Sequence, residues 1–341
     1  MNEKTKAKKM LKYFIGMDIH AQSTTICVLN AQGEVYDART LPTTERALRE
    51  YLQTMPASKG LVIEETSLSQ WLYTVLHEEV DDMVVCDPYR NSLLKDGAKT
   101  DAIDAHKLAD LYRVGLINPV FHSTDSRMEV RKLCSVYRNV THGLVQVQNQ
   151  QQAFLRRNGH QEEQLTALEK RIVHMHNERW ELYLQQRDLL KKDLEDLGKK
   201  YQEIRILKSH PGIGPIGAVK IMACVIDPKR FPTKHKFWSY CGLVRHPRES
   251  AGKNAGSKKA RGNRQLKCVF KTAVVTVLQG EKLTPMKVYY NGLIQKGLTE
   301  RNARQALARK IAANVLACWK KKEYFKADYE AQKERKAKNM R

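Results

Sequence analysis

Four acidic side chains occupy positions where they could hold a metal ion. Asp18 and Glu64 each end a short apolar segment that predicts a buried strand. Asp101 and Asp104 are three residues apart at the start of a helical pattern, which places them on one helix face. Desolvated carboxylates at the ends of strands need a cation nearby. The spacing therefore predicts that the four acids converge on one site.

Oxygen ligands of this kind suit Mg²⁺ or Mn²⁺. Two such ions about 4 Å apart can hold the attacking and leaving oxygens of a phosphodiester exchange. Taken one at a time, Asp101 is better explained as a helix N-cap and Asp104 as a surface acid that complements the helix dipole. Only the set of four favours a metal. The sequence leaves open whether Glu64 or Glu65 is the second ligand.

A serine among basic residues forms a second candidate centre. Ser250 lies in a glycine-containing loop whose basic residues are Arg245, Arg248, Lys253, Lys258, Lys259 and Arg261. These cations could offset the charge of a phosphate toward which the Ser250 hydroxyl is directed. Most loop serines bond only backbone or water, and no general base is visible next to this one. The residues alone therefore leave a nucleophilic role for Ser250 open.

The net charge of +23 is confined to the C-terminal part of the chain. Residues 206–341 contain 31 Lys and Arg against 8 Asp and Glu, whereas residues 1–205 contain 29 of each. Such one-sided charge is typical of a domain that binds nucleic acid. The basic part lacks the amphipathic pattern of a membrane-binding face. Since no apolar run reaches about 18 residues, we expect a cytoplasmic protein with no membrane partner.

The elements that must position the acids form an α/β pattern over residues 13–121. Short β-branched and aromatic runs at 13–19, 24–29 and 34–36 predict an antiparallel meander. Alternating helical and strand patterns follow, namely a helix at 44–55, a strand at 60–63, a helix at 68–79 and a strand at 83–86. This order predicts a domain of the ribonuclease H type.

A long helical pattern without proline follows over residues 126–207. Apolar residues recur every three or four positions, which predicts two long helices in a coiled-coil hairpin that turns at Asn158-Gly159. Hairpins of this kind most often serve dimerisation or spacing. The seven cysteines are scattered and never form a C-x-x-C pair, so we expect free thiols.

A glycine-rich turn at 210–217 opens the basic part of the chain. It contains G-x-G-x-x-G, but it follows a charged helix rather than a strand, so a dinucleotide site is a poor interpretation. A helix-hairpin-helix-like turn fits better. Backbone N–H groups near Gly212 and Gly214, at the start of a helix over 217–225, could then bind a nucleic-acid phosphate. The alternative is an ordinary helix-capping turn.

Six motifs together resemble one family. They are Gly-Met-Asp at 16–18, Glu-Glu-Thr at 64–66, Lys-Thr-Asp-Ala-Ile-Asp-Ala at 99–105, Pro-Gly-Ile-Gly at 211–214, Tyr-Cys-Gly-Leu at 240–243 and Arg-Gly-Asn at 261–263. In order and spacing, over nearly the whole chain, they look like the DEDD transposases of the insertion-sequence one-ten family, relatives of the Piv invertase.

The resemblance implies a domain plan and a set of roles. It implies a RuvC-like metal domain at 1–125, a coiled coil at 126–205, a mainly helical transposase domain at 206–325 and a basic tail at 326–341. Asp18, Glu64, Asp101 and Asp104 match the family's metal quartet, and Ser250 matches its nucleophilic serine. Two departures, Ala251 before Gly252 and the upstream shift of Ser257, favour Ser250 over Ser257 without deciding between them.

The function implied is that of a bacterial, nucleoid-associated DNA recombinase. A structured non-coding bridge RNA would pair with donor and target double-stranded DNA. The protein, a homo-oligomer that is a dimer or, on DNA, a tetramer, would cut and rejoin strands through a covalent phosphoserine. The alternatives are a RuvC-type junction nuclease that hydrolyses DNA with two metals, and a non-catalytic nucleic-acid scaffold. Target and donor sequences would lie in the RNA and not in the side chains.

Overall fold

The computed structural model describes residues 11–56, 58–89, 100–159, 164–250, 253–259 and 261–327, with the backbone alone for 246–250 and 253–259. The chain divides after Asp125 into two compact units. In the described ranges, no helix combines the length and apolar character needed to cross a bilayer.

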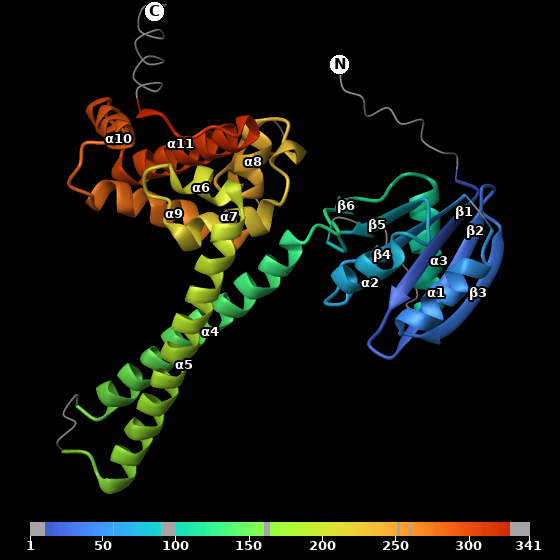
Figure 1. Cartoon of the computed structure of the whole chain (residues 1–341), viewed down its shortest axis with the longest axis horizontal. Helices are drawn as coiled ribbons and strands as arrows, with labels where there is room; N and C mark the ends of the chain where they lie inside the picture. The colour runs from blue at the N-terminus through green and yellow to red at the C-terminus, as the bar shows by residue number, and fades with distance from the viewer. Residues whose placement is uncertain are drawn as a thin grey trace, which may run out of the picture. The chain divides into compact units, whose positions relative to one another are not determined.

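The first unit contains a six-stranded sheet in the order β3-β2-β1-β4-β5-β6 (Figure 1). The first three strands form the predicted antiparallel meander, β4 and β5 continue it in parallel with β1, and β6 is antiparallel to β5. The strands are β1 (Tyr13–Ile19), β2 (Ser23–Asn30), β3 (Val35–Pro42), β4 (Lys59–Glu64), β5 (Asp82–Cys86) and β6 (Pro119–Val120). This mixed sheet is consistent with the ribonuclease H-type domain that the sequence predicts.

Two differences from the sequence expectations concern the sheet edges. β3 runs to Pro42, whereas the predicted strand ends at residue 36. The sequence pattern does not reveal the remaining residues, because this strand is mostly exposed and has no apolar alternation. The two-residue β6 was not predicted, since a strand so short has no periodicity. Both strands lie at an edge, where burial does not constrain the residue pattern.

Helices cover both faces of the sheet. Alternate β1 residues, including Ile15 and Met17, pack in the main core of this unit with residues of α1 (Glu45–Thr54) and α2 (Ser69–Leu76). The residues between them point to the other face, where α3 (Asp101–Arg113) lies. Asp18 therefore shares a sheet face with the start of α3.

Gly16 allows α3 to lie directly on β1. A Cβ atom at this position would be 2.2 Å from the Ala105 carbonyl oxygen and 2.6 Å from the Ala109 backbone nitrogen. Both obstacles are backbone atoms, so a side chain could be accommodated only if the whole helix moved. The Gly-Met-Asp motif thus combines a contact residue for α3 with an acid two positions later.

The second unit begins with the predicted helical hairpin (Figure 1). α4 (Arg127–Arg157) ends at the predicted turn, where Gly159 has a φ of 74°, and the next residues, 160–163, lie outside the described ones. α5 (Ala167–Lys200) starts with a capping box in which Thr166 and Glu169 bond each other's backbone N–H groups.

The second long helix is shorter than predicted. Its pattern suggested a continuous helix to residue 207, but Tyr201 is extended and a separate helix, α6 (Gln202–Lys208), follows. Because of this break, α6 changes direction, and Ile204 and Leu207 lie almost fully buried in the apolar core of the second unit. Periodicity continued through the break because both helices bury apolar residues at the same spacing.

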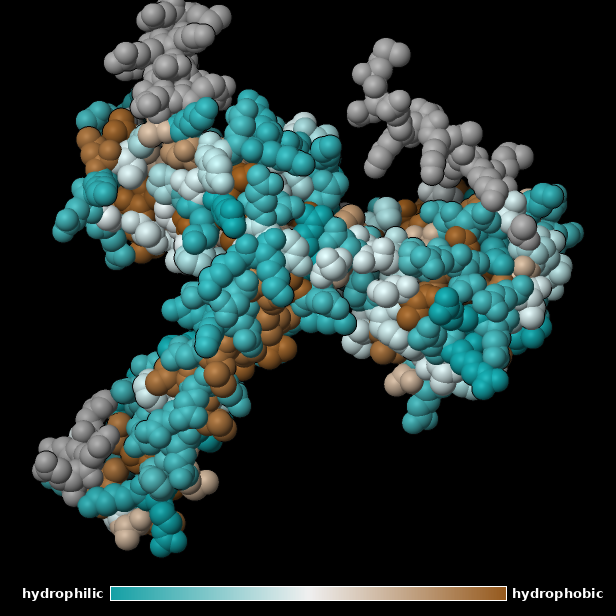
Figure 2. Space-filling view, viewed as in Figure 1, coloured by the Kyte–Doolittle hydropathy of each residue, from teal (hydrophilic) through white to brown (hydrophobic). Residues whose placement is uncertain are grey.

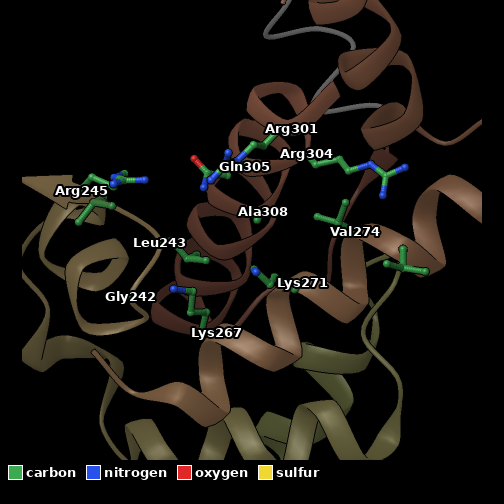
Figure 3. Close-up of a pocket in the computed structure, with 12 residues that line it drawn as sticks. Gly242, Leu243, Arg245, Lys267, Lys271, Val274, Arg301, Arg304, Gln305 and Ala308 are labelled. Carbon is green, nitrogen blue, oxygen red and sulfur yellow. The ribbon is translucent and has the colours of Figure 1, made fainter. Parts of the chain in front are cut away.

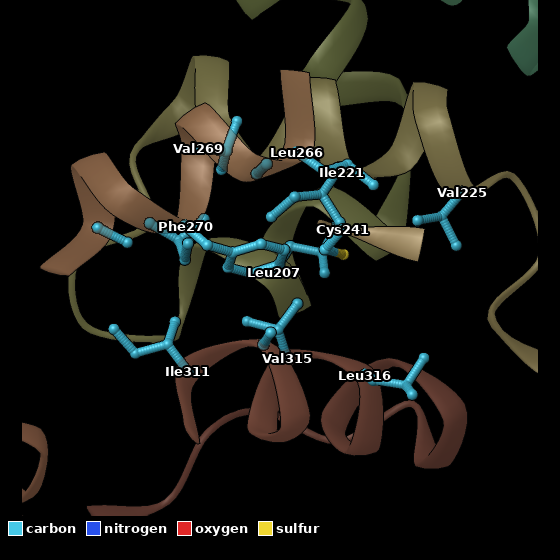
Figure 4. Packing of buried hydrophobic residues seen from close by; sticks show 14 of the residues in the cluster. Leu207, Ile221, Val225, Cys241, Leu266, Val269, Phe270, Ile311, Val315 and Leu316 are labelled. Carbon is cyan, nitrogen blue, oxygen red and sulfur yellow. The ribbon is translucent and has the colours of Figure 1, made fainter. Parts of the chain in front are cut away.

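The remaining helices enclose one apolar core (Figure 4). Phe237 and Phe270 are its largest fully buried side chains, and their rings meet edge to face at 6.0 Å. The helices are α7 (Pro215–Val225), α8 (Lys234–Tyr240), α9 (Arg264–Gln279), α10 (Pro285–Gln295) and α11 (Glu300–Lys321), with a 3-10 turn at Pro228–Arg230 and a two-stranded sheet of β7 (Arg245–Ser250) and β8 (Lys253–Lys259).

All seven cysteines are free thiols, as predicted. Burial raises the pKa of Cys134 to about 12.

Replacing Gly16 tests the contact between β1 and α3. We expect Gly16→Ala to lower the free energy of unfolding by about 3 kcal/mol, because overpacking here must displace backbone atoms. Urea unfolding followed by circular dichroism measures the change. Gly292→Ala is the matched control, since a Cβ there meets no described atom within 4 Å and α10 gains a better helix former. Equal stability of the two variants would contradict the packing role of Gly16.

Candidate metal centre and serine hairpin

The carboxyl end of β1 and the first turn of α3 bring three of the four predicted acids together. Asp18 lies in β1, and Asp101 and Asp104 lie in the first turn of α3. The negative charges of Asp101 and Asp104 both raise the pKa of Asp18, so the two side chains lie near it. The fourth, Glu64, ends β4 one residue beyond the registered pair Met17–Ile63, so the sheet places it beside Asp18.

Strand alternation distinguishes Glu64 from Glu65. Val62 packs with α3, and residues two apart in a strand share a face, so Glu64 lies on the α3 side of the sheet. Glu65 follows on the opposite side, with its backbone N–H bonded to the Cys86 carbonyl at 3.0 Å. The backbone therefore favours Glu64 as the member of the acid cluster.

A histidine joins the acids. His20 Nε2 lies 3.3 Å from Asp18 Oδ2 and 3.5 Å from Asp101 Oδ1, and the three potential ligand atoms are within 4.8 Å of one another. The sequence reasoning did not identify this residue. Its position two residues after Asp18 was the available signal, because alternate residues of an extended segment lie on the same side.

Burial and the neighbouring negative charges disfavour the ionised form of Asp18, and a bound cation would offset both effects. Burial raises the pKa of Asp18, and the nearby Asp101 and Asp104 raise it further, whereas His20 lowers it. Asp104 Oδ1 is buried and has no hydrogen-bond partner within the described part of the chain. A buried carboxylate oxygen normally has a partner. Asp18, His20 and Asp101 therefore fit a divalent cation, with Asp104 and Glu64 beside them.

Asp101 is not the N-cap of α3. The cap is Thr100, whose side chain accepts a hydrogen bond from the Ile103 N–H at 3.3 Å. The alternative explanation of Asp101 as a capping residue is thus wrong, because the preceding threonine already fills that position. Asp101 is the first residue of the helix, 58% exposed, and its carboxylate is available to a ligand.

The segment that carries the candidate nucleophile is a β-hairpin and not the predicted loop. β7 pairs with β8 in antiparallel register, with Ser250 opposite Lys253 and Pro247 opposite Ser257. Ser250 is therefore the last residue of its strand, next to the hairpin turn, and Ser257 lies farther from that turn. Residues 251 and 252 fall outside the described ones, as do the side chains of Ser250, Ser257, Arg248, Lys253, Lys258 and Lys259.

Two glycines fix the base of this hairpin. A Cβ at Gly262 would lie 2.4 Å from the Gly242 backbone nitrogen, so the chain segments that enter and leave the hairpin cross in close contact. Asn263 N–H donates to the Tyr240 carbonyl at 2.7 Å, and the Asn263 side chain caps α9. The motifs at 240–243 and 261–263 thus anchor the hairpin to the helical core.

The glycine-rich turn joins two helices, as predicted. α7 begins at Pro215, two residues before the predicted start, and Gly214 is its N-cap. Gly212 has a φ of 86°, and a Cβ there would be 2.5 Å from the Ala273 carbonyl oxygen. Packing against α9 therefore accounts for Gly212 by itself. Within the described residues, no atom lies within 4 Å of a Cβ at Gly214, and its backbone is therefore open to a ligand.

Comparison with known families decides the class of the protein. A family model described as a transposase, of the DEDD type of the IS110 family, matches residues 15–159. A second, described as transposase IS116/IS110/IS902 family, matches residues 204–291. The chain belongs to the IS110 family of DEDD transposases. No curated protein matches it.

Membership in this transposase family gives both centres a context. The first match contains the acid cluster, and the second contains the glycine-rich turn and the serine hairpin. A DEDD transposase acts on DNA and uses a divalent metal at its acids. The acid cluster of the first unit is the group of described residues suited to that role.

Removing one carboxylate tests the metal centre. We expect Asp104→Asn to weaken Mn²⁺ binding by roughly tenfold or more, because a neutral amide of equal volume replaces a hard anionic ligand. Isothermal titration of the whole protein measures the affinity. Asp110→Asn, on the same helix but paired with Arg113 at 2.6 Å, is the control and should leave binding unchanged. Equal affinity of the Asp104→Asn and unmodified proteins would exclude this centre.

Proposed function

We propose that the protein is an RNA-guided DNA recombinase of an insertion element that cuts and rejoins DNA through a covalent phosphoserine. The acid cluster carries this proposal, because Asp18, His20 and Asp101 bring potential ligand atoms within 4.8 Å of one another. Asp104, in the same first turn of α3, presents a buried oxygen without a described partner. Such a set suits Mg²⁺, or Mn²⁺ in its place. Asp18, Glu64, Asp101 and Asp104 are the proposed metal ligands.

The metal, when bound, would stabilise the negative charge that develops on phosphate oxygens during strand transfer. The protein's own residues fix where this happens. β1 and α3 hold the acids in one cluster, since Gly16 locks their backbones together. His20, in contact with both Asp18 and Asp101, holds these two carboxylates in place or adds a nitrogen ligand.

Ser250 is the proposed nucleophile. Its place beside the turn of a hairpin suits a residue that must reach a DNA backbone. The Ser250 hydroxyl loses its proton and its Oγ bonds to phosphorus, while one backbone P–O bond breaks and the departing oxygen takes up a proton. A hydroxyl of the strand to be joined then bonds to phosphorus and displaces Oγ. Because P–O bonds are exchanged one for one, rejoining needs no external energy source.

The proposed nucleic-acid contacts lie in the basic unit. Backbone N–H groups near Gly212 and Gly214 and the cations Arg245, Arg248, Lys253, Lys258, Lys259 and Arg261 are the candidates. Donor and target DNA and a bridge RNA are the proposed partners. The motif resemblance supports a bridge RNA as partner. Sequencing the RNA that copurifies with the protein tests this partner.

The competing function is a junction nuclease of the RuvC type, which would hydrolyse DNA at the same acids. In that enzyme Ser250 would be a structural residue and no protein would become attached to DNA. A non-catalytic scaffold would leave the buried Asp104 oxygen unexplained. Trapping of a covalent protein–DNA adduct separates the recombinase from both alternatives.

Loss of the serine hydroxyl tests the nucleophile. We expect Ser250→Ala to abolish both the covalent adduct and recombination while DNA and RNA binding persist, since only one oxygen is removed. Denaturing electrophoresis with labelled DNA detects the adduct. Ser257→Ala, opposite Pro247 on the other strand, should retain most activity. An adduct formed by Ser250→Ala would move the assignment to Ser257 or another residue.

The helical hairpin supports a homo-oligomer. Four apolar side chains spaced by seven residues form an exposed stripe along α5, namely Leu168, Met175, Leu182 and Leu189, which are 66%, 59%, 54% and 66% exposed. Figure 2 shows apolar residues along this hairpin. Apolar residues at heptad spacing are typical of helix pairing, and exposed apolar patches mark interaction sites.

A second copy of the chain is the proposed occupant of this stripe. In an antiparallel pairing about the middle of α5, Leu168 faces Leu189 and Met175 faces Leu182 of the other copy. The same register brings Glu178 of one copy beside Arg179 of the other, which is an attractive pair. A parallel pairing would instead oppose Arg171 to itself and Glu178 to itself.

A charge in the stripe should separate the copies. We expect Leu182→Glu to weaken self-association by at least tenfold, because two buried leucines would be replaced by two carboxylates near the symmetry axis. Sedimentation equilibrium of the whole protein measures this. Leu182→Met keeps the volume and apolar character and should associate normally. An unchanged oligomer in Leu182→Glu would place the interface elsewhere.

A further inference from the structure

A cationic cavity lies between the base of the serine hairpin and two helices of the second unit. It has a volume of about 340 Å³ and is lined by the start of β7, by α9 and by α11 (Figure 3). In Figure 3, α9 contributes Lys267 and Lys271, and α11 contributes Arg301 and Arg304. With Arg245 from β7, five cations line one cavity. We call it the α9–α11 pocket.

Two of the five cations, Lys271 and Arg301, are not compensated by any residue that the structure describes. The described residues that line it include no acid. Lys271 and Arg301 form no ion pair with any described residue, and both are exposed. Arg304 pairs with Glu300 at 3.2 Å, on the exposed side of α11. Cations gathered in a concave site attract anions, because low-dielectric walls concentrate their field.

The floor of the pocket is apolar. Val275, which is 41% exposed, and Leu243 line the cavity together with the almost fully buried Val274 and Ala308. Gln305 provides an amide that can both donate and accept hydrogen bonds. The pocket therefore combines an anion-binding rim, an apolar floor and one group able to bond the edge of a planar base.

We propose that the α9–α11 pocket binds one unpaired nucleotide of a nucleic-acid strand. The base lies on the floor at Val274 and Ala308, within reach of Gln305, and the flanking phosphates contact Lys271 and Arg301. The volume of about 340 Å³ matches a single small ligand. Apolar surfaces under bases together with a cationic rim are what single-strand binding sites provide.

The pocket also has a place in strand exchange, a step that rests on the proposed function. Arg245 opens β7, and Ser250 is five residues farther along the same strand, about 17 Å away in an extended chain. A strand whose nucleotide is held in the pocket would be fixed a short distance from the hairpin tip. Holding an unpaired base there would keep a cleaved strand from drifting before it is rejoined.

Binding of short oligonucleotides to the full-length protein tests the pocket. The probes are a single-stranded DNA, the same sequence as RNA, the DNA duplex, and the single strand with abasic sites. We expect the Lys271→Met/Arg301→Met double variant to bind the single strand roughly tenfold more weakly. The matched control is Lys282→Met/Lys296→Met, which removes two exposed charges outside the pocket and should change binding less than about twofold.

Loss of the bases should mimic loss of the pocket. We expect the unmodified protein to bind the abasic strand roughly tenfold more weakly than the normal strand, because base contacts with the apolar floor are missing. Ala308→Leu, which fills the floor, should remove this preference, with circular dichroism confirming its folding. If Ala308→Leu does not fold, the ratio of normal-strand to abasic-strand affinity is measured in the Lys271→Met/Arg301→Met variant. This ratio should fall there as well.

The outcomes discriminate between explanations. A preference for DNA assigns the nucleotide to the strand being exchanged, and a preference for RNA assigns it to the guide. Equal loss of binding in the two double variants, or equal binding of normal and abasic strands, would overturn the proposal. Ser250→Ala should bind all probes normally, so a failure of the covalent mechanism would show in adduct formation and not in these affinities.

Discussion

The contact between Gly16 of β1 and the backbone of α3 is the constraint on which the candidate metal centre depends. Only a residue without a side chain lets the helix lie close enough for the carboxylates of its first turn to meet Asp18. Thr100 then fixes where the helix starts, and so which residues occupy that turn. The cluster repels itself, and burial of Asp18 adds to the cost. Packing energy from elsewhere in the unit must hold these acids together until a cation offsets their charge.

A second pair of backbone contacts plays the same part for the serine hairpin. The backbones at Gly242 and Gly262 are in such close contact that one methyl group would push the two chain segments apart. After the hairpin, the Asn263 N–H donates a hydrogen bond to the Tyr240 carbonyl. Both centres of the protein are therefore placed by glycines that lie outside them. In the motifs at 16–18, 240–243 and 261–263, the glycine therefore determines how closely two backbone segments approach each other.

The sequence predicted the parts of the molecule that have strong periodicity. The central strands, the helices of the first unit and the hairpin turn at Asn158-Gly159 follow from alternation and helical spacing. It did not predict the break at Tyr201, because apolar spacing continues across it, nor the full length of the polar edge strand β3. At the candidate site, the helical spacing of Asp101 and Asp104 could be read directly, whereas only its position two residues after Asp18 marked His20. Its contact with Asp101 depends on how α3 packs on β1, which is a tertiary contact.

The separation of charge along the chain follows from the reaction proposed for it. A cluster of carboxylates repels a phosphodiester, so a metal alone must compensate several charges before DNA can approach. The first 205 residues have equal numbers of acids and bases and cannot provide this attraction, whereas residues 206–341 carry the whole excess of positive charge. Attraction of DNA and proposed metal binding are thus assigned to different parts of the chain. Cations placed among the acids would pair with them and compete with the metal, and keeping the two groups in separate units avoids this competition.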